Sequence, residues 1–128
     1  MKRIAFVLHE PSVNRIIGDK LNLQLEDKAN VIDVINEVDR LIKSKGDFPV
    51  PSYQSLLHMV YNPLTNKFYK QAAILAYKAT KEMLNVRDKP EQELPEDAIV
   101  ILIPAGGCIS EWEEAINPQE FLKAIHKP

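Results

Sequence analysis

The residues with the most specific chemical meaning are two adjacent glycines, Gly106 and Gly107, followed by the single cysteine of the chain, Cys108. They come after the most hydrophobic strand-like run, residues 98–103, and the whole chain has only four glycines. Because glycine loses more backbone freedom on folding than any other residue, such a pair indicates backbone that turns sharply, stays flexible or passes close to another molecule. Which of these uses applies decides the chemistry that the pair can support.

The residues that follow the glycine pair allow several interpretations. Ser110 and Glu113 have the spacing of a capping box, which predicts a tight glycine turn into a helix beginning at Glu111. Free backbone N–H groups at such a helix start would also attract an anion, although no lysine follows the glycines as in phosphate-binding loops. The same helix start would make Cys108 reactive by stabilising its thiolate, whereas a cysteine beside Ile109 more often packs as a small hydrophobic residue.

The remaining polar residues give no catalytic or metal-binding pattern. His9, His58 and His126 are scattered, with no carboxylate at ligand spacing, and no serine lies in a nucleophile-elbow sequence. The net charge of −2, from 16 basic and 18 acidic residues, argues against nucleic acid or a membrane as a partner. A single cysteine allows no intramolecular disulfide, and the apolar run at residues 4–8 is too short for a signal sequence. We therefore expect a cytoplasmic protein.

The first part of the chain predicts a hairpin followed by one helix. Residues 4–8 are apolar at nearly every position, as in a strand buried on both faces, and residues 21–25 alternate leucine with polar residues. A turn around Gly18 joins these two strands. Asn30 then opens a helix that ends near Gly46, because apolar residues recur three and four positions apart between them. This apolar stripe consists of Val31, Val34, Ile35, Val38, Leu41 and Ile42.

The second part of the chain mixes strand and helix signals. The prolines in residues 47–53 exclude a helix there, and residues 56–61 look like a third strand. Within residues 69–84, the run 72–77 could be a strand, but the alanines and the spacing of the apolar residues favour a helix over the whole stretch. Residues 98–103 predict a buried strand. The chain after Cys108 is expected to be helical, with a last helix opened by Asn117-Pro118.

These elements predict an α+β fold in which a mixed sheet packs on one main helix, the β-grasp arrangement. The end of this pattern, ELPEDAIVILIPAGG from Glu93 to Gly107, resembles the end of ubiquitin-like sulfur carriers. These are the small subunit of molybdopterin synthase, the thiazole-synthesis sulfur carrier and the ubiquitin-related modifier. We expect a β-grasp domain over residues 1–107 with an inserted helix within residues 46–92, and a C-terminal helical extension over residues 108–128.

In the sulfur-carrier family the chemistry takes place at a terminal glycine carboxylate. The resemblance implies that Gly107, preceded by Gly106, would be adenylated and then converted to a thiocarboxylate. It also implies an E1-like adenylating enzyme that uses ATP and magnesium, and a sulfur acceptor such as the large subunit of molybdopterin synthase. The chain itself would bind no cofactor and no metal, and it would be a carrier rather than an enzyme.

The position of the glycine pair leaves two functions open. In the family the pair is terminal, but here it is internal, so a carrier needs cleavage of the Gly107–Cys108 bond. The alternative is an uncleaved β-grasp interaction module in which the pair is a strand-to-helix turn. A carrier predicts a dispensable tail. The uncleaved module predicts that the large apolar residues of the tail are buried, namely Trp112, Phe121, Leu122 and Ile125.

Overall fold

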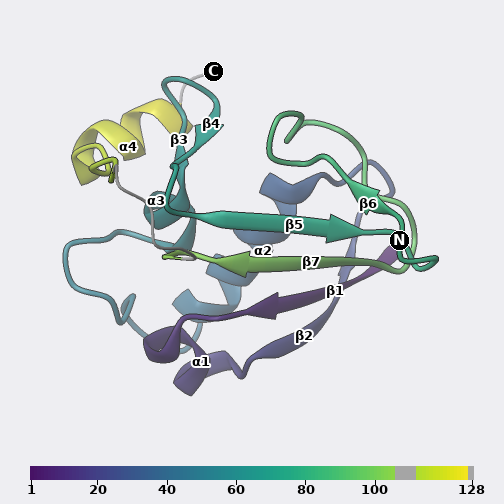
Figure 1. Ribbon diagram of the computed structural model, residues 1–128. Helices are drawn as coiled ribbons and strands as arrows, with labels where there is room; N and C mark the ends of the chain where they lie inside the picture. Colours follow the sequence, from purple (N-terminus) through teal and green to yellow (C-terminus); the bar gives the residue numbers. More distant parts are fainter. Residues whose placement is uncertain (106–111, 127–128) are drawn as a thin grey trace.

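The computed structural model describes residues 1–105 and 112–126, and its main element is a five-stranded mixed sheet (Figure 1). The fold is therefore α+β, as the sequence predicts. In chain order the elements are β1 (Lys2–Leu8), α1 (Pro11–Ile17), β2 (Lys20–Leu25), α2 (Val31–Lys43), α3 (Leu56–Val60), β3 (Tyr61–Asn62), β4 (Lys67–Phe68), β5 (Ala73–Tyr77), β6 (Met83–Leu84), β7 (Ala98–Ile103) and α4 (Pro118–Ile125).

The order of strands in the sheet is β2-β1-β7-β5-β6. The first strand, β1, is antiparallel to β2 and parallel to β7, whereas β5 is antiparallel to both β7 and β6. The register places Phe6 opposite Leu21 on one side and Val100 on the other. The last strand therefore lies in the centre of the sheet beside the first strand, which confirms the predicted neighbours. β3 and β4 pair separately as a short hairpin.

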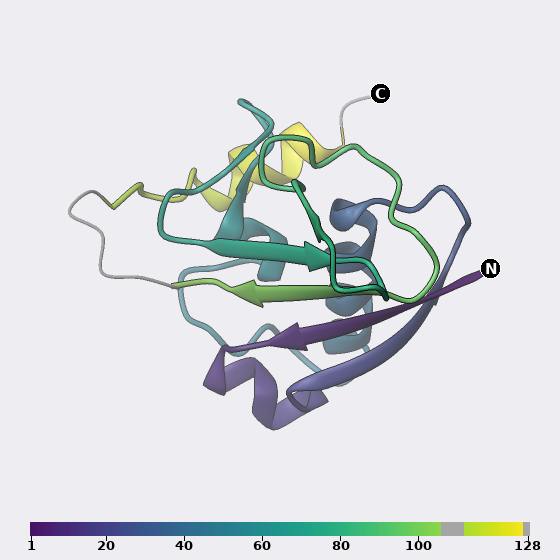
Figure 2. The ribbon, with the colours of Figure 1, turned by 45° about the vertical axis from the view of Figure 1, so that its right-hand side comes forward.

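Helix α2 packs against one face of the sheet and closes the hydrophobic core (Figure 2). It begins at a capping box. The Asn30 side chain accepts a hydrogen bond from the Asp33 N–H, and the Asp33 carboxylate accepts one from the Asn30 N–H. The predicted helix and the predicted strands at residues 4–8, 21–25 and 98–103 are confirmed. The helix buries Val31, Val34, Ile35, Val38 and Ile42.

A short helix that the sequence analysis did not predict, α1, joins the two strands of the first hairpin. The Glu10 carboxylate caps it by accepting a hydrogen bond from the Ser12 N–H at 3.2 Å, and Pro11 lies in its first turn. Gly18 ends it with a φ of 84°, in the left-handed region that favours glycine. Val13 is buried and fixes this helix on the core.

The prediction of a strand over residues 56–61 is wrong, because most of this stretch is helix α3. Its first N–H groups are bonded by two side chains: Ser55 accepts from the His58 N–H, and Asp39 on α2 accepts from the N–H groups of Leu56 and Leu57. Only Tyr61, the last residue of the predicted strand, is extended, in β3. A carboxylate from another element thus stabilises a helix that the local apolar run did not reveal.

The prediction of a helix over residues 69–84 is also wrong, because this stretch supplies β5 and β6. The strand β5 pairs with β7 from Ala73 opposite Ile103 to Tyr77 opposite Ile99. Backbone pairing with a central strand outweighs the helical preference of its alanines. At Lys81 the turn between the two strands has a φ of 73°, which no helix contains. Part of the expected insertion is therefore part of the main sheet.

The C-terminal segment, defined here as residues 112–126, begins without regular structure and ends in α4. The expected helix at Asn117-Pro118 is confirmed, with the Asn117 side chain accepting a hydrogen bond from the Gln119 N–H at 2.8 Å. The expectation of helix before it is wrong for residues 112–117. Among the helices of the described ranges, none has the length and apolar character needed to cross a membrane.

Candidate functional site

The glycine pair and the cysteine, Gly106, Gly107 and Cys108, lie outside the described residues, as does Ser110 of the expected capping box. The structure describes what comes directly before them. β7 ends at Ile103, which lies opposite Ala73 of β5. The next residue, Pro104, is buried. The central strand of the sheet thus leads into the sequence that carries the pair.

The first anchor of the C-terminal segment is the buried side chain of Gln71. Its amide nitrogen donates a hydrogen bond to the Glu113 carbonyl at 2.7 Å, and its amide oxygen accepts one from the Glu113 N–H at 3.1 Å. Gln71 is 4% exposed. Because an unpaired amide at that depth would cost free energy, both contacts hold Glu113 in place.

The second anchor consists of Tyr69 and His58, which bind both backbone groups of Ile116. The Ile116 N–H donates a hydrogen bond to the Tyr69 hydroxyl at 3.0 Å, and Nε2 of His58 lies 2.7 Å from the Ile116 carbonyl oxygen. His58 Nδ1 accepts from the Gln54 N–H, so Nε2 carries the proton and donates to Ile116. Burial raises the pKa of Tyr69, which keeps its hydroxyl protonated.

The third anchor is hydrophobic and comes from α4. Phe121 is 1% exposed, and its ring centroid lies 4.8 Å from that of His58. The uncleaved module predicts four buried residues here. Phe121 fits, but Trp112 is 58% exposed and Ile125 is 41% exposed, while Leu122 is half-buried. The segment is therefore attached by one ring and by backbone contacts rather than by a continuous apolar face.

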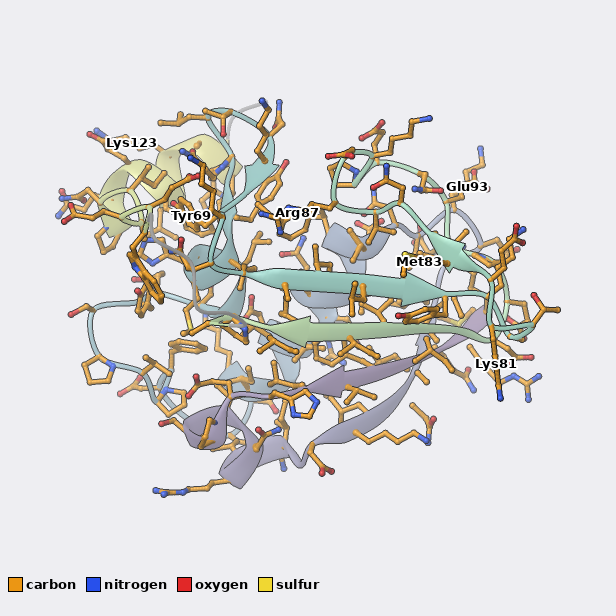
Figure 3. The ribbon with its side chains drawn as sticks, viewed as in Figure 1. Tyr69, Lys81, Met83, Arg87, Glu93 and Lys123 are labelled. Atoms are coloured by element: carbon orange, nitrogen blue, oxygen red, sulfur yellow. The ribbon has the colours of Figure 1, made fainter. Side chains whose placement is uncertain are left out.

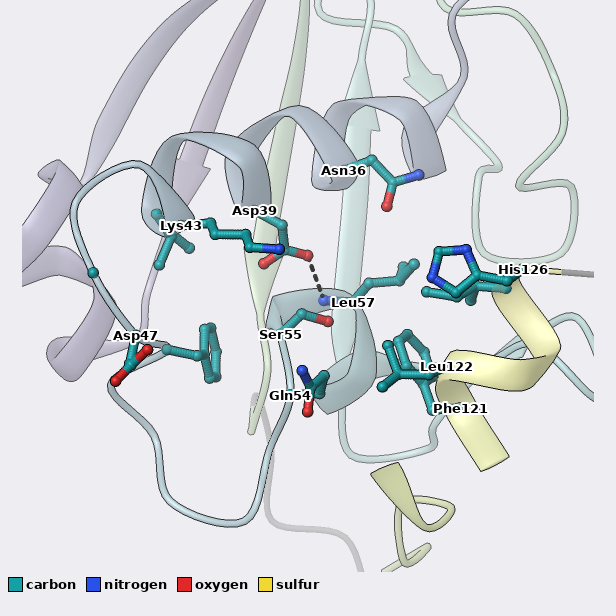
Figure 4. A pocket seen from close by; sticks show the side chains of 14 residues that line it. Asn36, Asp39, Lys43, Asp47, Gln54, Ser55, Leu57, Phe121, Leu122 and His126 are labelled. Carbon is teal, nitrogen blue, oxygen red and sulfur yellow. Dashed lines mark hydrogen bonds between the residues drawn. The ribbon is translucent and has the colours of Figure 1, made fainter. Parts of the chain in front are cut away.

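A cavity of about 320 Å³ lies between α2, α3 and α4 (Figure 4). Asp39 lines it and bonds the N–H groups of Leu56 and Leu57 at 2.7 and 3.1 Å. Burial raises the pKa of Asp39 from 3.8 to about 6, and the two hydrogen bonds oppose this rise. Lys43 and His126 bring further polar groups to the rim. The carboxylate is engaged in capping α3.

The face of the sheet opposite α2 is apolar over β1, β7 and β5, and we call it the outer sheet face. In Figure 1 it faces the viewer, and no helix in the drawn part of the chain lies across it. The register sets side chains in rows: Val7 opposite Ile101 opposite Leu75, and Ile99 opposite Tyr77. These side chains are half-buried. Polar residues occupy the matching positions of the edge strand β2: Lys20, Asn22 and Gln24.

Sequence reasoning missed the residues that hold the C-terminal segment. Tyr69 falls within the stretch predicted as helix, Gln71 belongs to no recognisable pattern, and His58 is one of three scattered histidines. His58 contacts residues far away in the chain, so no local spacing reveals its role. Among the residues that the structure describes, no group of three histidine, cysteine or acidic side chains could hold a metal ion. His9 and His126 are both exposed.

The chain was compared with protein-family models, with curated proteins and with solved structures, and nothing matches it in any of the three comparisons.

Proposed function

We propose that the chain is a ubiquitin-like β-grasp protein that acts as a protein-binding module and keeps its C-terminal segment. A β-grasp sheet has an N-terminal hairpin, a crossover helix and a last strand that enters the centre beside the first. The order β2-β1-β7-β5-β6, with α2 between β2 and β5, supports this topology. In this reading β5 and β6 are the third and fourth strands of the grasp, and α3, β3 and β4 form the insertion.

The single observation that carries the proposal is the outer sheet face. One face of the sheet is covered by α2, but Val7, Ile101 and Leu75 on the other face form a row across three strands. Contiguous apolar surface of this kind is typical of a protein interface, particularly when polar residues surround it. Met83, on the edge strand β6, is 61% exposed and extends the face at one end. The partner expected here is a protein that presents a complementary apolar surface.

The proposal is tested by crosslinking from inside the face. A photo-crosslinking amino acid replaces Leu75, and in a matched chain it replaces Lys45, an exposed residue in the loop after α2. Both full-length chains are irradiated in an extract of the source cells. We expect one specific protein adduct from position 75 that is absent from position 45. Adding Ile101→Lys should remove that adduct while circular dichroism stays unchanged.

Two results would decide against the outer sheet face. Identical adducts from both positions would mean that the contact is not specific to it, and an adduct that persists in the Ile101→Lys chain would mean that the partner binds elsewhere. A crosslink to a second copy of the chain would support the face and identify the partner as the chain itself.

A second candidate function is the sulfur carrier. The observation that favours it is that β7, the central strand parallel to β1, leads directly into the sequence of Gly106 and Gly107. In this function the Gly107 carboxylate is exposed by cleavage of the Gly107–Cys108 bond. An E1-like enzyme then adenylates it with ATP and magnesium, and sulfur passes to an acceptor such as a molybdopterin synthase large subunit. Detection of a Gly107 thiocarboxylate in the purified protein tests this candidate.

A further inference from the structure

We propose that His58, Tyr69 and Gln71 form a peptide-binding site whose occupant is the C-terminal segment, and that this segment stays bound as a separate peptide after the backbone is cut between residues 105 and 112. The site lies apart from the outer sheet face. The inference therefore does not depend on the proposed partner. The class of ligand is a peptide without regular structure that continues into a short helix bearing a phenyl ring.

The polar contacts of the site bind the peptide backbone rather than polar side chains. Its three side chains make four hydrogen bonds, and these satisfy both backbone groups of Glu113 and both of Ile116. Hydrogen bonds to main-chain groups give affinity in many peptide-binding proteins. In this site buried side chains replace the sheet edge that usually provides such bonds. Glu114, between the two bonded residues, is exposed.

The turn that carries Tyr69 and Gln71, and the ring of His58, are also held by contacts that do not involve the C-terminal segment. The Arg87 guanidinium donates hydrogen bonds to the carbonyls of Tyr69 and Ala72 at 2.9 and 2.5 Å, which holds the turn that carries Gln71. In Figure 3 Tyr69 lies beside α4. His58 is fixed by its bond from the Gln54 N–H. A site whose groups are already oriented loses little freedom on binding, so its affinity is higher.

The phenyl ring of the segment supplies the hydrophobic part of the recognition. Phe121 is fully enclosed and lies against the ring of His58, the same residue that bonds the Ile116 carbonyl. His58 therefore makes both a hydrogen bond to the segment's backbone and a contact with its buried phenyl ring. Trp112 and Ile125, near the two ends of the segment, are more exposed than Phe121, so we expect them to contribute less to recognition.

The second candidate function requires cleavage of the Gly107–Cys108 bond, which lies between the sheet domain and the C-terminal segment. Hydrolysis of the Gly107–Cys108 bond consumes one water and leaves a carboxylate on Gly107 and an amine on Cys108. Each of the four anchoring hydrogen bonds joins a residue before that bond to a residue after it, so they hold the two pieces together. The product would be a two-chain protein with a free glycine terminus, and the peptide would have to be displaced before the site became empty.

The experiment uses the full chain with residues 106–111 replaced by the recognition sequence of a specific protease. Cleavage is run to completion, in dilute urea followed by dialysis if the native chain resists, and is checked by mass under denaturing conditions. Native size-exclusion chromatography then separates bound from free peptide. We expect the peptide to elute together with the body, by which we mean the part of the chain before the cut. Elution of the peptide on its own, with the body folded or unfolded, would overturn the inference.

Two changes test whether hydrogen bonds to its backbone hold the peptide in the site. Labelled peptide in the cut protein is displaced by synthetic peptide 112–126, and by the same peptide carrying an N-methyl group on Ile116, which removes the hydrogen bond to Tyr69. Loss of one buried hydrogen bond should weaken binding about tenfold. This change leaves the body intact. In the cut protein, Gln71→Glu removes the donor to the Glu113 carbonyl and should speed peptide release by a similar factor.

The matched control is Gln119→Ala in the peptide, at an exposed position of α4 whose backbone alone is bonded. Its affinity should stay within about twofold of the unmodified peptide, since exposed substitutions have small effects. If the control substitution and N-methylation weakened peptide affinity equally, the backbone hydrogen bonds would not be what holds the peptide.

Discussion

Gln71 and Glu113 are 42 residues apart in the chain, yet the buried amide of the first satisfies both backbone groups of the second. Gln71 lies just before β5, and Glu113 lies in the irregular part of the C-terminal segment. This pairing ties the segment to the sheet domain. It makes the segment a structural part of the described protein, together with the Ile116 and Phe121 contacts.

The first prediction concerns the ring that anchors α4. Phe121→Ala should lower the free energy of unfolding by about 3 kcal/mol, because it empties an enclosed site against His58. Urea denaturation of the full chain measures the change. Gln119→Ala, on the exposed side of the same helix, should alter it by less than about 0.5 kcal/mol. Equal stability of the two variants would mean that α4 contributes nothing to the fold.

The second prediction concerns the pH dependence of stability. Burial raises the folded-state pKa of Asp39 to about 6, above its ordinary value of 3.8. The folded protein therefore holds the proton more tightly than the unfolded chain does, and the stability from this group is complete below about pH 4. It is lost as the pH rises through 6, by roughly 3 kcal/mol.

The Asp39 prediction is measured as the difference between the native chain and Asp39→Asn in urea denaturation from pH 4 to 7. The native chain should lose stability relative to the variant as the pH rises. Lys43 and His126 line the same cavity in both proteins, so the difference isolates Asp39. A difference that does not change with pH, or that changes in the opposite direction, would contradict the assignment.

The third prediction concerns Arg87, which holds the turn between β4 and β5. Arg87→Met removes the donors to the Tyr69 and Ala72 carbonyls and should lower the free energy of unfolding by about 2 to 3 kcal/mol. The comparison is Arg15→Met on the exposed side of α1, expected to change it by less than about 0.5 kcal/mol. Hydrogen exchange of the Glu113 amide should also quicken in the Arg87 variant. If exchange of the Glu113 amide did not change, Arg87 would not be needed to hold the Gln71–Glu113 contact.

The fourth prediction concerns the capping box of α2. Asn30→Ala removes the side chain that accepts from the Asp33 N–H at 3.0 Å, and it should cost about 1 kcal/mol of stability. Asn30→Asp keeps the acceptor and should cost less. If both substitutions had the same effect in thermal unfolding, the side-chain cap would not contribute.

The elements that the sequence predicted correctly are those with a local signal. The stripe from Val31 to Ile42 and the apolar run at residues 98–103 specify their own structure. Residues 56–60 and 73–77 could not be assigned in this way, because a carboxylate on α2 and pairing with β7 decide their structures. Long-range contacts of this kind leave no periodic pattern in the chain.

The candidate site was only partly accessible to sequence reasoning for the same reason. The glycine pair is visible because its residue type is unusual, but Tyr69 meets Ile116 across 47 residues and Gln71 meets Glu113 across 42. A glutamine that bonds backbone carries no signature in one sequence. Of the four tail residues expected to be buried in an uncleaved module, Phe121 alone is fully enclosed.

The measurement that tests the account most directly is the intact mass, under denaturing conditions, of the untagged protein purified from its own source. Covalent attachment of the C-terminal segment separates the binding module from the carrier. We predict a chain that continues past Gly107 and contains residues 108–128. A chain ending at Gly107, with the added mass of sulfur in place of oxygen, would contradict the module and establish the carrier.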